Sequence, residues 1–451
     1  MKQDINRREF IKTAGVAGLA MTGIGVLSGC MNSSSASVEN AENGEMTLRT
    51  NPGNGDKVSI LGYGCMRWPM IKDEDGKDII DQEAVNSLVD HAMANGVNYY
   101  DTSPVYLQGQ SEEATGIALK RHPRESYFIA TKLSNFSNYT RENSMLMYKK
   151  SFEKLQTDYI DYYLLHSIGG GGIEVFNQRY VDNGMVDFLV EERKAGRIRN
   201  LGFSFHGDKD SFDAFMELHE KYHWDFVQIQ LNYIDWRHAG GRSANAEYLQ
   251  AELDKRGIPS IIMEPLLGGR LAKVPQHIAE RLKEREPQKS VASWAFRFAG
   301  THPGVLCVLS GMTYMEHLQD NLASFSPLVP LTQSELSFLE DTAILMKEYP
   351  TIPCNDCKYC MPCPYGIDIP AILLHYNKCV NAGEIAGPES ENYKKARQAY
   401  LVSYDRAVPK LRQAARCIGC GQCTSHCPQS IDIPKEIRKI DKYVDNLKKS
   451  L

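Results

Sequence analysis

Two short runs of cysteines constrain this chain more than any other feature of its sequence. They contain eight of its twelve cysteines: Cys354, Cys357, Cys360 and Cys363 in the first run, and Cys417, Cys420, Cys423 and Cys427 in the second. Cysteines two residues apart in a local turn can point inward around one centre, whereas a disulfide framework spreads its cysteines across the fold. The spacing therefore predicts that both runs bind a metal ion or a metal cluster.

Each run ends in Cys-Pro and is followed by a similar phrase, YGIDIP at 365–370 and QSIDIP at 429–434, which indicates an internal repeat. The second run, CIGCGQCTSHCP, resembles bacterial two-cluster ferredoxins, in which each cluster is bound by three cysteines of one run and the last cysteine of the other. The resemblance implies two [4Fe-4S] clusters, one held by Cys354, Cys357, Cys360 and Cys427 and the other by Cys417, Cys420, Cys423 and Cys363. The first run is one residue short before its last cysteine, so Cys379 is an alternative to Cys363. Structural zinc, which also uses paired cysteines, is the other interpretation.

The first thirty residues carry the marks of an export signal. Arg7 and Arg8 precede an uncharged stretch at 14–27 that is rich in Ala and Gly. A membrane helix needs about 20 apolar residues, so this stretch is too short to span a bilayer and is typical of a signal peptide. The paired arginines resemble a twin-arginine signal. We expect residues 1–30 to direct export across the cytoplasmic membrane.

The end of this segment predicts a lipid anchor. The run LSGC, which ends at Cys30, resembles a bacterial lipoprotein cleavage box, and the alternative is ordinary cleavage beside an incidental cysteine. Residues 31–45 are rich in Ser, Asn and Glu and predict a flexible tether. We therefore expect a periplasmic protein or a lipoprotein attached to the membrane through lipidated Cys30.

The middle of the chain alternates between short strand-like runs and helical segments. The strand-like runs are 58–61, 97–100, 127–130, 160–165, 198–203, 226–230, 258–263 and 305–309. Eight such runs with helical crossovers predict an α/β protein whose parallel strands close into a (β/α)8 TIM barrel over residues 46–330. The alternation stops there, and Thr332 to Glu335 form a capping-box signature. We expect residues 331–451 to be a mainly helical ferredoxin-type domain.

Polar residues at the ends of these runs predict an active site. In such barrels the chemistry lies at the carboxyl ends of the strands, where Asp101, Tyr106, Lys132 and His166 would meet. A carbonyl that accepts hydride develops alkoxide charge and needs a proton, which Tyr106 can donate. Lys132, paired with Asp101, is expected to lower the phenol pKa, and His166 to orient the carbonyl oxygen. Four glycines at 169–172 predict a long loop over the site, either a substrate lid or a slack surface loop.

The runs LGYGCMR, DTSPVY, ATK and LLH, in this order, resemble the aldo/keto reductases over roughly residues 46–330. The resemblance implies NAD or NADP as cofactor. It assigns contacts with the cofactor to Ser204, Gln228, Leu266, Ser310, Gly311 and Asn321. NADP-preferring members place a Lys and an Arg where this chain has Gly311 and His317. A phosphate without a nearby cation lacks charge-assisted hydrogen bonds, so the choice between NAD and NADP stays open.

Charge and cofactor chemistry limit the function. The chain has 51 Lys and Arg against 56 Asp and Glu, which gives no basic footprint for nucleic acid. We expect an oxidoreductase that interconverts a carbonyl and an alcohol on a small organic substrate, with the clusters connecting the site to an unidentified redox partner. Clusters move single electrons and a nicotinamide moves a hydride, so one alternative is a cluster-fed reductase without nicotinamide. The other is a non-catalytic electron carrier or binding module.

Overall fold

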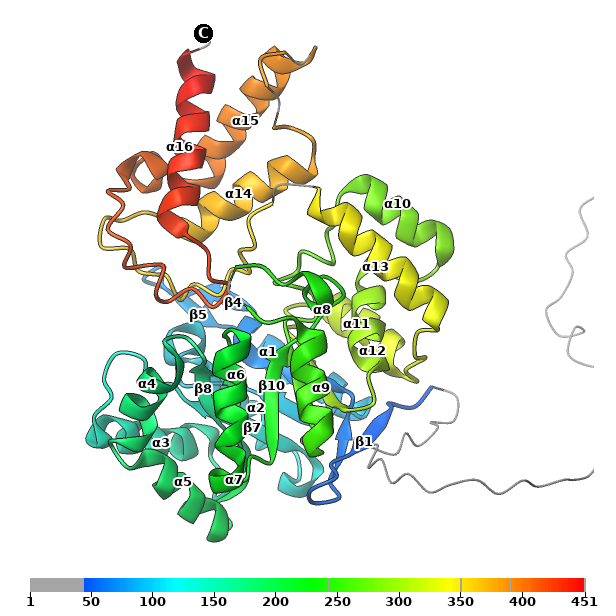
Figure 1. The fold of residues 1–451 in the computed structure, drawn as a ribbon, viewed down its shortest axis with the longest axis vertical. Coiled ribbons are helices and arrows are strands. Elements are labelled where there is room, and N and C mark those ends of the chain that lie inside the picture. Colours follow the sequence, from blue (N-terminus) through cyan, green and yellow to red (C-terminus); the bar gives the residue numbers. More distant parts are fainter. Residues whose placement is uncertain (1–43, 242, 349–350, 386, 390, 450–451) are drawn as a thin grey trace, which may run out of the picture. The chain divides into compact units, whose positions relative to one another are not determined.

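The computed structural model describes residues 44–241, 243–348, 351–385, 387–389 and 391–449 (Figure 1). The expected signal peptide, Cys30 and most of the tether lie outside the described residues. Within the described part of the chain, no helix is both long enough and apolar enough to cross a membrane.

Eight parallel strands form a closed barrel, which confirms the predicted fold class. In chain order they are β3 (Leu61–Gly64), β6 (Tyr99–Asp101), β7 (Phe128–Leu133), β8 (Ile160–Ile168), β9 (Ile198–Phe205), β10 (Phe226–Gln230), β11 (Ser260–Met263) and β12 (Val305–Ser310), and β12 pairs with β3 to close the ring. Alternate residues of the strands fill the interior, among them Tyr162 and Leu164 on β8. The interior is therefore a packed core, and the polar strand ends are left for a site.

Crossover helices cover the outside of the barrel. They include α1 (Gln82–Ala94), α2 (Ser111–Leu119), α3 (Arg141–Leu155), α5 (Met185–Lys194), α6 (Lys209–Glu217), α9 (Ala246–Arg256), α11 (Val291–Thr301) and α12 (Met315–Phe325). Helix α1 shows why these segments are helical. Asp81 caps its first turn by accepting a hydrogen bond from the amide of Ala84, and Val85, Leu88 and Val89 form one buried stripe.

The first strand-like run, 58–61, does not form a single strand as expected. Its beginning belongs to β2 (Lys57–Ser59), which pairs antiparallel with β1 (Leu48–Thr50), and its end begins barrel strand β3. The Ser59 hydroxyl donates to the carbonyl of Leu61 at 2.7 Å and stabilises the turn between the two strands. The apolar residues run on through this turn, so the hydrophobic pattern of the sequence does not indicate it.

Helix α13 (Gln333–Lys347) links the two parts of the chain. The predicted capping box is present, with Thr332 and Glu335 hydrogen-bonded reciprocally. Leu339 of α13 belongs to the barrel core, whereas the second core begins at Ile352. The two hydrophobic cores therefore separate after α13, later in the chain than residue 330.

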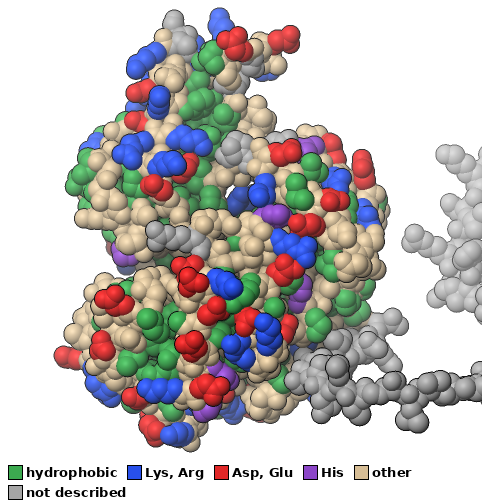
Figure 2. Space-filling view, in the orientation of Figure 1, with side chains coloured by type: hydrophobic (Ala, Val, Ile, Leu, Met, Phe, Trp, Pro, Cys, Tyr) green, Lys and Arg blue, Asp and Glu red, His purple; other side chains and the backbone are tan. Residues whose placement is uncertain are grey.

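The C-terminal part is helical. Helices α14 (Ile369–Asn381), α15 (Tyr393–Ala407) and α16 (Ile433–Lys449) pack together around the second core (Figure 1). Both IDIP phrases begin a helix, because Asp368 caps α14 and Asp432 accepts a hydrogen bond from the amide of Lys435 in α16. Figure 2 shows acidic and basic side chains interspersed over the visible face, in keeping with the net charge of −5.

Candidate active site at the carboxyl ends of the barrel strands

The four predicted catalytic residues meet at one end of the barrel. Asp101 ends β6, Lys132 and His166 lie near the ends of β7 and β8, and Tyr106 begins the short 3-10 turn that follows β6. The Lys132 Nζ atom lies 2.5 Å from Asp101 Oδ1 and 5.0 Å from the centre of the Tyr106 ring. The tetrad expected from the sequence is therefore assembled.

Asp101 and Lys132 form a buried pair whose pKa values are shifted in opposite directions. Burial raises the pKa of Asp101 and lowers that of Lys132, and the attraction between the two opposes both shifts. The expectation that Lys132 lowers the phenol pKa of Tyr106 is wrong in this structure. Burial raises the pKa of Tyr106 well above its ordinary value, and the nearby Tyr359 and Asp101 raise it further. Tyr106 is therefore a protonated phenol, which can donate its proton to an alkoxide.

His166 is a neutral imidazole in this environment. Burial lowers its pKa well below the ordinary value, and the positive charges of Lys132 and Arg179 lower it further. Its Nδ1 atom lies 2.5 Å from the Ser134 hydroxyl, and its backbone carbonyl accepts from the Arg179 guanidinium at 2.7 Å. These contacts fix the ring and leave Nε2 to face the site.

The segment after β8 differs from the expected long loop. Gly172 already begins helix α4 (Gly172–Phe176), so the glycines form a tight turn. A side-chain carbon at Gly169 would lie 2.6 Å from the carbonyl oxygen of His206, which explains why a glycine is needed there. This segment forms neither a long lid nor a slack loop.

Tyr359 is a site residue that the sequence reasoning missed. It lies between Cys357 and Cys360, in the segment 353–363 that we call the first cysteine loop. Its hydroxyl lies 3.3 Å from His166 Nε2 and close enough to Tyr106 to raise the pKa of that phenol, and its ring lies 5.8 Å from that of Phe136. The one available signal was an aromatic residue within a short cysteine run, and nothing in the run indicates which partner it reaches.

The first cysteine loop is docked on the turn that follows β11. The side-chain amide of Asn355 donates to Glu264 Oε1 at 3.0 Å. The backbone carbonyl of Asn355 accepts from the Arg67 guanidinium at 2.8 Å. Gly268 has a φ of +68°, and a side-chain carbon there would lie 2.4 Å from Asn355 Cα. Glu264 Oε2 is hidden from solvent and has no hydrogen-bond partner among the described residues, and burial raises the pKa of this carboxyl group.

The predicted carboxamide contacts lie side by side. Ser204 and Gln228 are register partners on β9 and β10, and both are buried. The Ser204 hydroxyl accepts from the amide of Ser167 at 2.7 Å, whereas Gln228 Oε1 has no partner among the described residues. An unpaired buried acceptor suits the amide N–H of a nicotinamide. Leu266, in contrast, belongs to the turn that the first cysteine loop covers.

The remaining predicted contacts lie after β12. Asn321 donates to the Ser310 hydroxyl at 2.8 Å, so these two residues hold each other. A side-chain carbon at Gly311 would lie 3.1 Å from Arg67 Cδ. Arg67 therefore lies against Gly311 through its aliphatic carbons, while its guanidinium donates to the backbone carbonyl of Asn355. Its guanidinium lies 3.9 Å from the carboxylate of Asp356.

Among the described residues no three metal-ligating side chains are close enough to hold one ion, but the first cysteine run lies near Cys427. Burial, with a smaller contribution from the nearby Cys427, raises the pKa of Cys354 to about 11 and that of Cys360 to about 12. Cys427 also raises the pKa of Cys357. In the second run, burial raises the pKa of Cys423, and its neighbours Cys417 and Cys420 add to this. Cys363 packs against the second core. Cys379 lies buried on α14, with its sulfur 3.6 Å from His375 Nε2.

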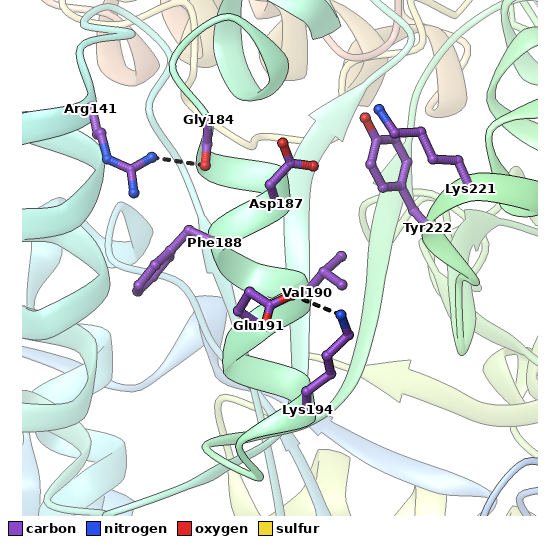
Figure 3. A pocket seen from close by; sticks show the side chains of 9 residues that line it. All are labelled: Arg141, Gly184, Asp187, Phe188, Val190, Glu191, Lys194, Lys221 and Tyr222. Atoms are coloured by element: carbon purple, nitrogen blue, oxygen red, sulfur yellow. Dashed lines mark hydrogen bonds and ion pairs between the residues drawn. The ribbon is translucent and has the colours of Figure 1, made fainter.

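A surface hollow of about 500 Å³ lies apart from the tetrad, beside α3, α5 and α7 (His219–Tyr222) (Figure 3). Charged side chains line much of it, and several are already engaged. Arg141 donates to the carbonyl of Gly184, and Lys194 pairs with Glu191, both at 2.8 Å. None of the predicted site residues lines this hollow.

Fold and site together define an oxidoreductase built on a (β/α)8 barrel with an iron–sulfur domain. The model of the aldo/keto reductase family matches residues 61–343, so the chain belongs to that family. The model of the 4Fe-4S dicluster domain matches residues 353–431.

Two curated relatives match the barrel. L-galactose dehydrogenase of Arabidopsis thaliana is 25% identical over 319 residues, which cover 67% of this chain and 95% of the relative. The uncharacterized oxidoreductase YqkF of Bacillus subtilis is 25% identical, over 63% of this chain and 92% of its own length.

Solved structures share the fold. The aldo-keto reductase AKR11C1 of Bacillus halodurans, in its holo form, superposes with a TM-score of 0.53 at 23% identity and covers 66% of this chain and 96% of its own. The aldo/keto reductase of Klebsiella pneumoniae in complex with NADP and acetate gives 0.51 at 21% identity, over 64% of this chain and 93% of its own.

Proposed function

We propose that this protein is an iron–sulfur oxidoreductase that interconverts a carbonyl and an alcohol on a small organic substrate. Tyr106 exchanges a proton with the reacting oxygen, and neutral His166 orients that oxygen through Nε2. Lys132 and Asp101 provide the buried charged pair beneath the phenol. The observation that supports this most strongly is the assembled tetrad, which lies 3.3 Å from a side chain of the first cysteine loop.

Bound clusters would supply the route for electrons. Oxidation of an alcohol to a carbonyl releases two electrons and two protons. Two four-iron clusters, when bound, would supply one-electron sites for both of these electrons, and an unidentified redox partner would then take them up. The proposed ligands are Cys354, Cys357, Cys360 and Cys427 for the first cluster, and Cys417, Cys420, Cys423 and Cys363 for the second. The proximity of Cys427 to the first run supports this exchange of the last cysteines.

A nicotinamide cofactor, NAD or NADP, would supply a hydride donor or acceptor at this site. The unpaired Gln228 Oε1 fits its carboxamide, and Ser204 lies beside it. Arg67 packs its aliphatic carbons against Gly311, and its guanidinium would have to leave the Asn355 carbonyl to bind a phosphate group. These contacts support binding of the cofactor but do not distinguish its two forms.

A cluster-fed reductase without nicotinamide is the second candidate. Asn355 lies directly against Gly268, in the turn that the family resemblance assigns to the cofactor. The unpaired oxygen of Glu264 beside this contact would repel a phosphate group if the carboxyl were ionised. Both observations favour a barrel site that the first cysteine loop itself completes.

The location of the protein remains a proposal. We propose export through a twin-arginine signal in residues 1–30, followed by attachment to the membrane through lipidated Cys30 or release into the periplasm. Mass spectrometry of the mature N-terminus tests this directly. A lipid-modified Cys30 supports the anchor, a free mature N-terminus near that position supports release, and an intact N-terminus in the cytoplasm contradicts export.

The decisive experiment is an anaerobic purification in which iron, acid-labile sulfide and released nicotinamide are measured in one sample. We expect about eight irons per chain, as two four-iron clusters require. L-galactose, the substrate named for one relative, is the first alcohol to test, with reduction of the clusters followed by electron paramagnetic resonance. Bound nicotinamide supports the first candidate, and full iron without nucleotide supports the second. Zinc in place of iron contradicts both, and full turnover by Tyr106→Phe favours the electron-carrier interpretation.

A further inference from the structure

The Tyr359 hydroxyl lies at the place where the reacting oxygen of a substrate would bind. In the proposed reaction, Tyr106 and His166 are the two groups that bind the reacting oxygen. The Tyr359 hydroxyl lies between them, at 3.3 Å from His166 Nε2 and close enough to Tyr106 to raise its pKa. A substrate oxygen must make the same two contacts, so it cannot bind there while Tyr359 remains.

Tyr359 also belongs to the segment that binds the first cluster under the proposed function. Two residues, Lys358 and Tyr359, separate Cys357 from Cys360. If both cysteines are bound to iron, this segment is fixed at each end and has very little slack. Asn355 holds the preceding part of the loop against Glu264 and Arg67. Displacement of the Tyr359 side chain must therefore change the packing or the hydrogen bonds around the cluster.

We propose that Tyr359 is a positioning residue that takes the place of the reacting oxygen in the substrate-free protein and transmits its displacement to the first cluster. Substrate binding in the barrel then changes the electronic environment of one cluster and leaves the other unaffected. The inference rests on the proposed function, because it requires a cluster at Cys354, Cys357, Cys360 and Cys427. It adds an aromatic hydroxyl from the cysteine domain to the barrel site.

A purely structural role for Tyr359 makes a different prediction. Its ring packs with Phe136 at 5.8 Å and with His166 at 6.2 Å between ring centres, and Tyr359→Phe would preserve this packing. The hydroxyl is needed only for the contacts with His166 and Tyr106. The proposal therefore concerns the hydroxyl, and a double-mutant cycle can isolate it.

The test uses the full-length protein, purified without oxygen, in four forms: wild type, His166→Phe, Tyr359→Phe and the double variant. His166→Phe retains an aromatic ring and removes Nε2. We measure the electron paramagnetic resonance signals and midpoint potentials of both reduced clusters. We expect His166→Phe to shift the signal and potential of one cluster when the Tyr359 hydroxyl is present, and to have no further effect in a protein that already carries Tyr359→Phe. His206→Phe, in the residue that follows the neighbouring strand β9, is the matched control and should shift neither cluster.

The outcomes distinguish a failure of the inference about Tyr359 from a failure of the proposed function. If both clusters are present and His166→Phe leaves their signals unchanged, the inference is overturned and the proposed function stands. The same holds for a shift that is equally large with and without the Tyr359 hydroxyl. A protein without cluster signals overturns the proposed function and the inference together. If His166→Phe does not fold, the comparison of wild type with Tyr359→Phe decides, because an unchanged signal there also contradicts transmission through the hydroxyl.

Discussion

Alanine at position 268 should loosen the first cysteine loop from the barrel. Gly268 has a φ of +68°, and its added carbon would lie 2.4 Å from Asn355 Cα, whereas ordinary contacts begin at 3.4 Å. The left-handed backbone costs an alanine about 1–2 kcal/mol. The clash is a separate cost, because the loop must move by about 1 Å to restore an ordinary contact.

The contacts that would be weakened set the size of that second cost. Asn355 donates to the Glu264 carboxyl group and accepts from Arg67, at 3.0 and 2.8 Å. Hydrogen bonds to charged groups contribute about 1.5–3 kcal/mol each, and partial loss of two suggests about 2–4 kcal/mol. Gly269→Ala is the matched control, since Gly269 has a φ of +91° and open space within 4 Å. The difference in unfolding free energy between the two variants measures the docking of the first cysteine loop, because both variants carry the backbone strain.

Thermal unfolding of the iron-loaded protein measures this difference. One kcal/mol shifts the melting temperature of a domain of 150–250 residues by about 2–4 °C, so Gly268→Ala should melt about 4–16 °C below Gly269→Ala. Limited proteolysis should also cut the first cysteine loop faster in Gly268→Ala. Equal melting temperatures and equal cleavage rates would show that the loop is not held against this turn.

Four further predictions test the site. Tyr106→Phe should reduce turnover by roughly 10²–10⁴-fold with an unchanged unfolding midpoint, and an undiminished rate would remove Tyr106 from the chemistry. Lys132→Met should cost about 3–5 kcal/mol in urea unfolding because it leaves a buried carboxylate unpaired, and a loss below about 1 kcal/mol would contradict the charged pair. The folded-state pKa of His166 lies well below its ordinary value, so the unfolded chain binds an extra proton in acid, and stability falls as the pH drops below about 6.5. His166→Gln should flatten this dependence in urea unfolding, and an unchanged slope would refute a neutral His166. Cys427→Ser should remove about four of eight irons by iron analysis, whereas Cys379→Ser should keep all eight, and equal iron in the two would refute the ligand set.

Much of the fold could be predicted because the spacing of apolar residues along the sequence differs between strands and helices. The eight strand-like runs alternate with amphipathic helices, and that alternation specifies a parallel barrel. The error at 58–61 has a local cause. Its apolar residues serve a hairpin at one end and a barrel strand at the other, and the Ser59 hydrogen bond that marks the change exists only in the folded chain.

The tetrad could be predicted for a related reason. Asp101, Lys132 and His166 lie near the ends of strands, and strand ends meet whatever the helices outside the barrel do. The direction of the Tyr106 pKa shift could not be predicted, because it depends on burial and on a charge that Lys132 already shares with Asp101. Residue identity shows which charges are available but not how deeply each is buried.

The residues that were missed have one physical property in common. Tyr359 reaches His166 across 193 positions of sequence, and Arg67 reaches Asn355 across 288. Such contacts depend on how one packed unit docks on another, and no local period encodes that. The family pattern is equally silent here, because the cysteine loop lies outside the segment that the family model matches.

The docked loop bears on the mismatch between single-electron clusters and two-electron carbonyl chemistry. A cluster domain that only received electrons could remain apart from the barrel and be joined to it by a linker. In this chain the first cysteine loop instead contributes Tyr359 to the tetrad and Asn355 to the turn after β11. Under the proposed function the reacting oxygen and the first cluster then lie at opposite ends of one short segment. Chemistry and electron storage would therefore belong to a single active site, in which occupation of the barrel is coupled to the state of the cluster.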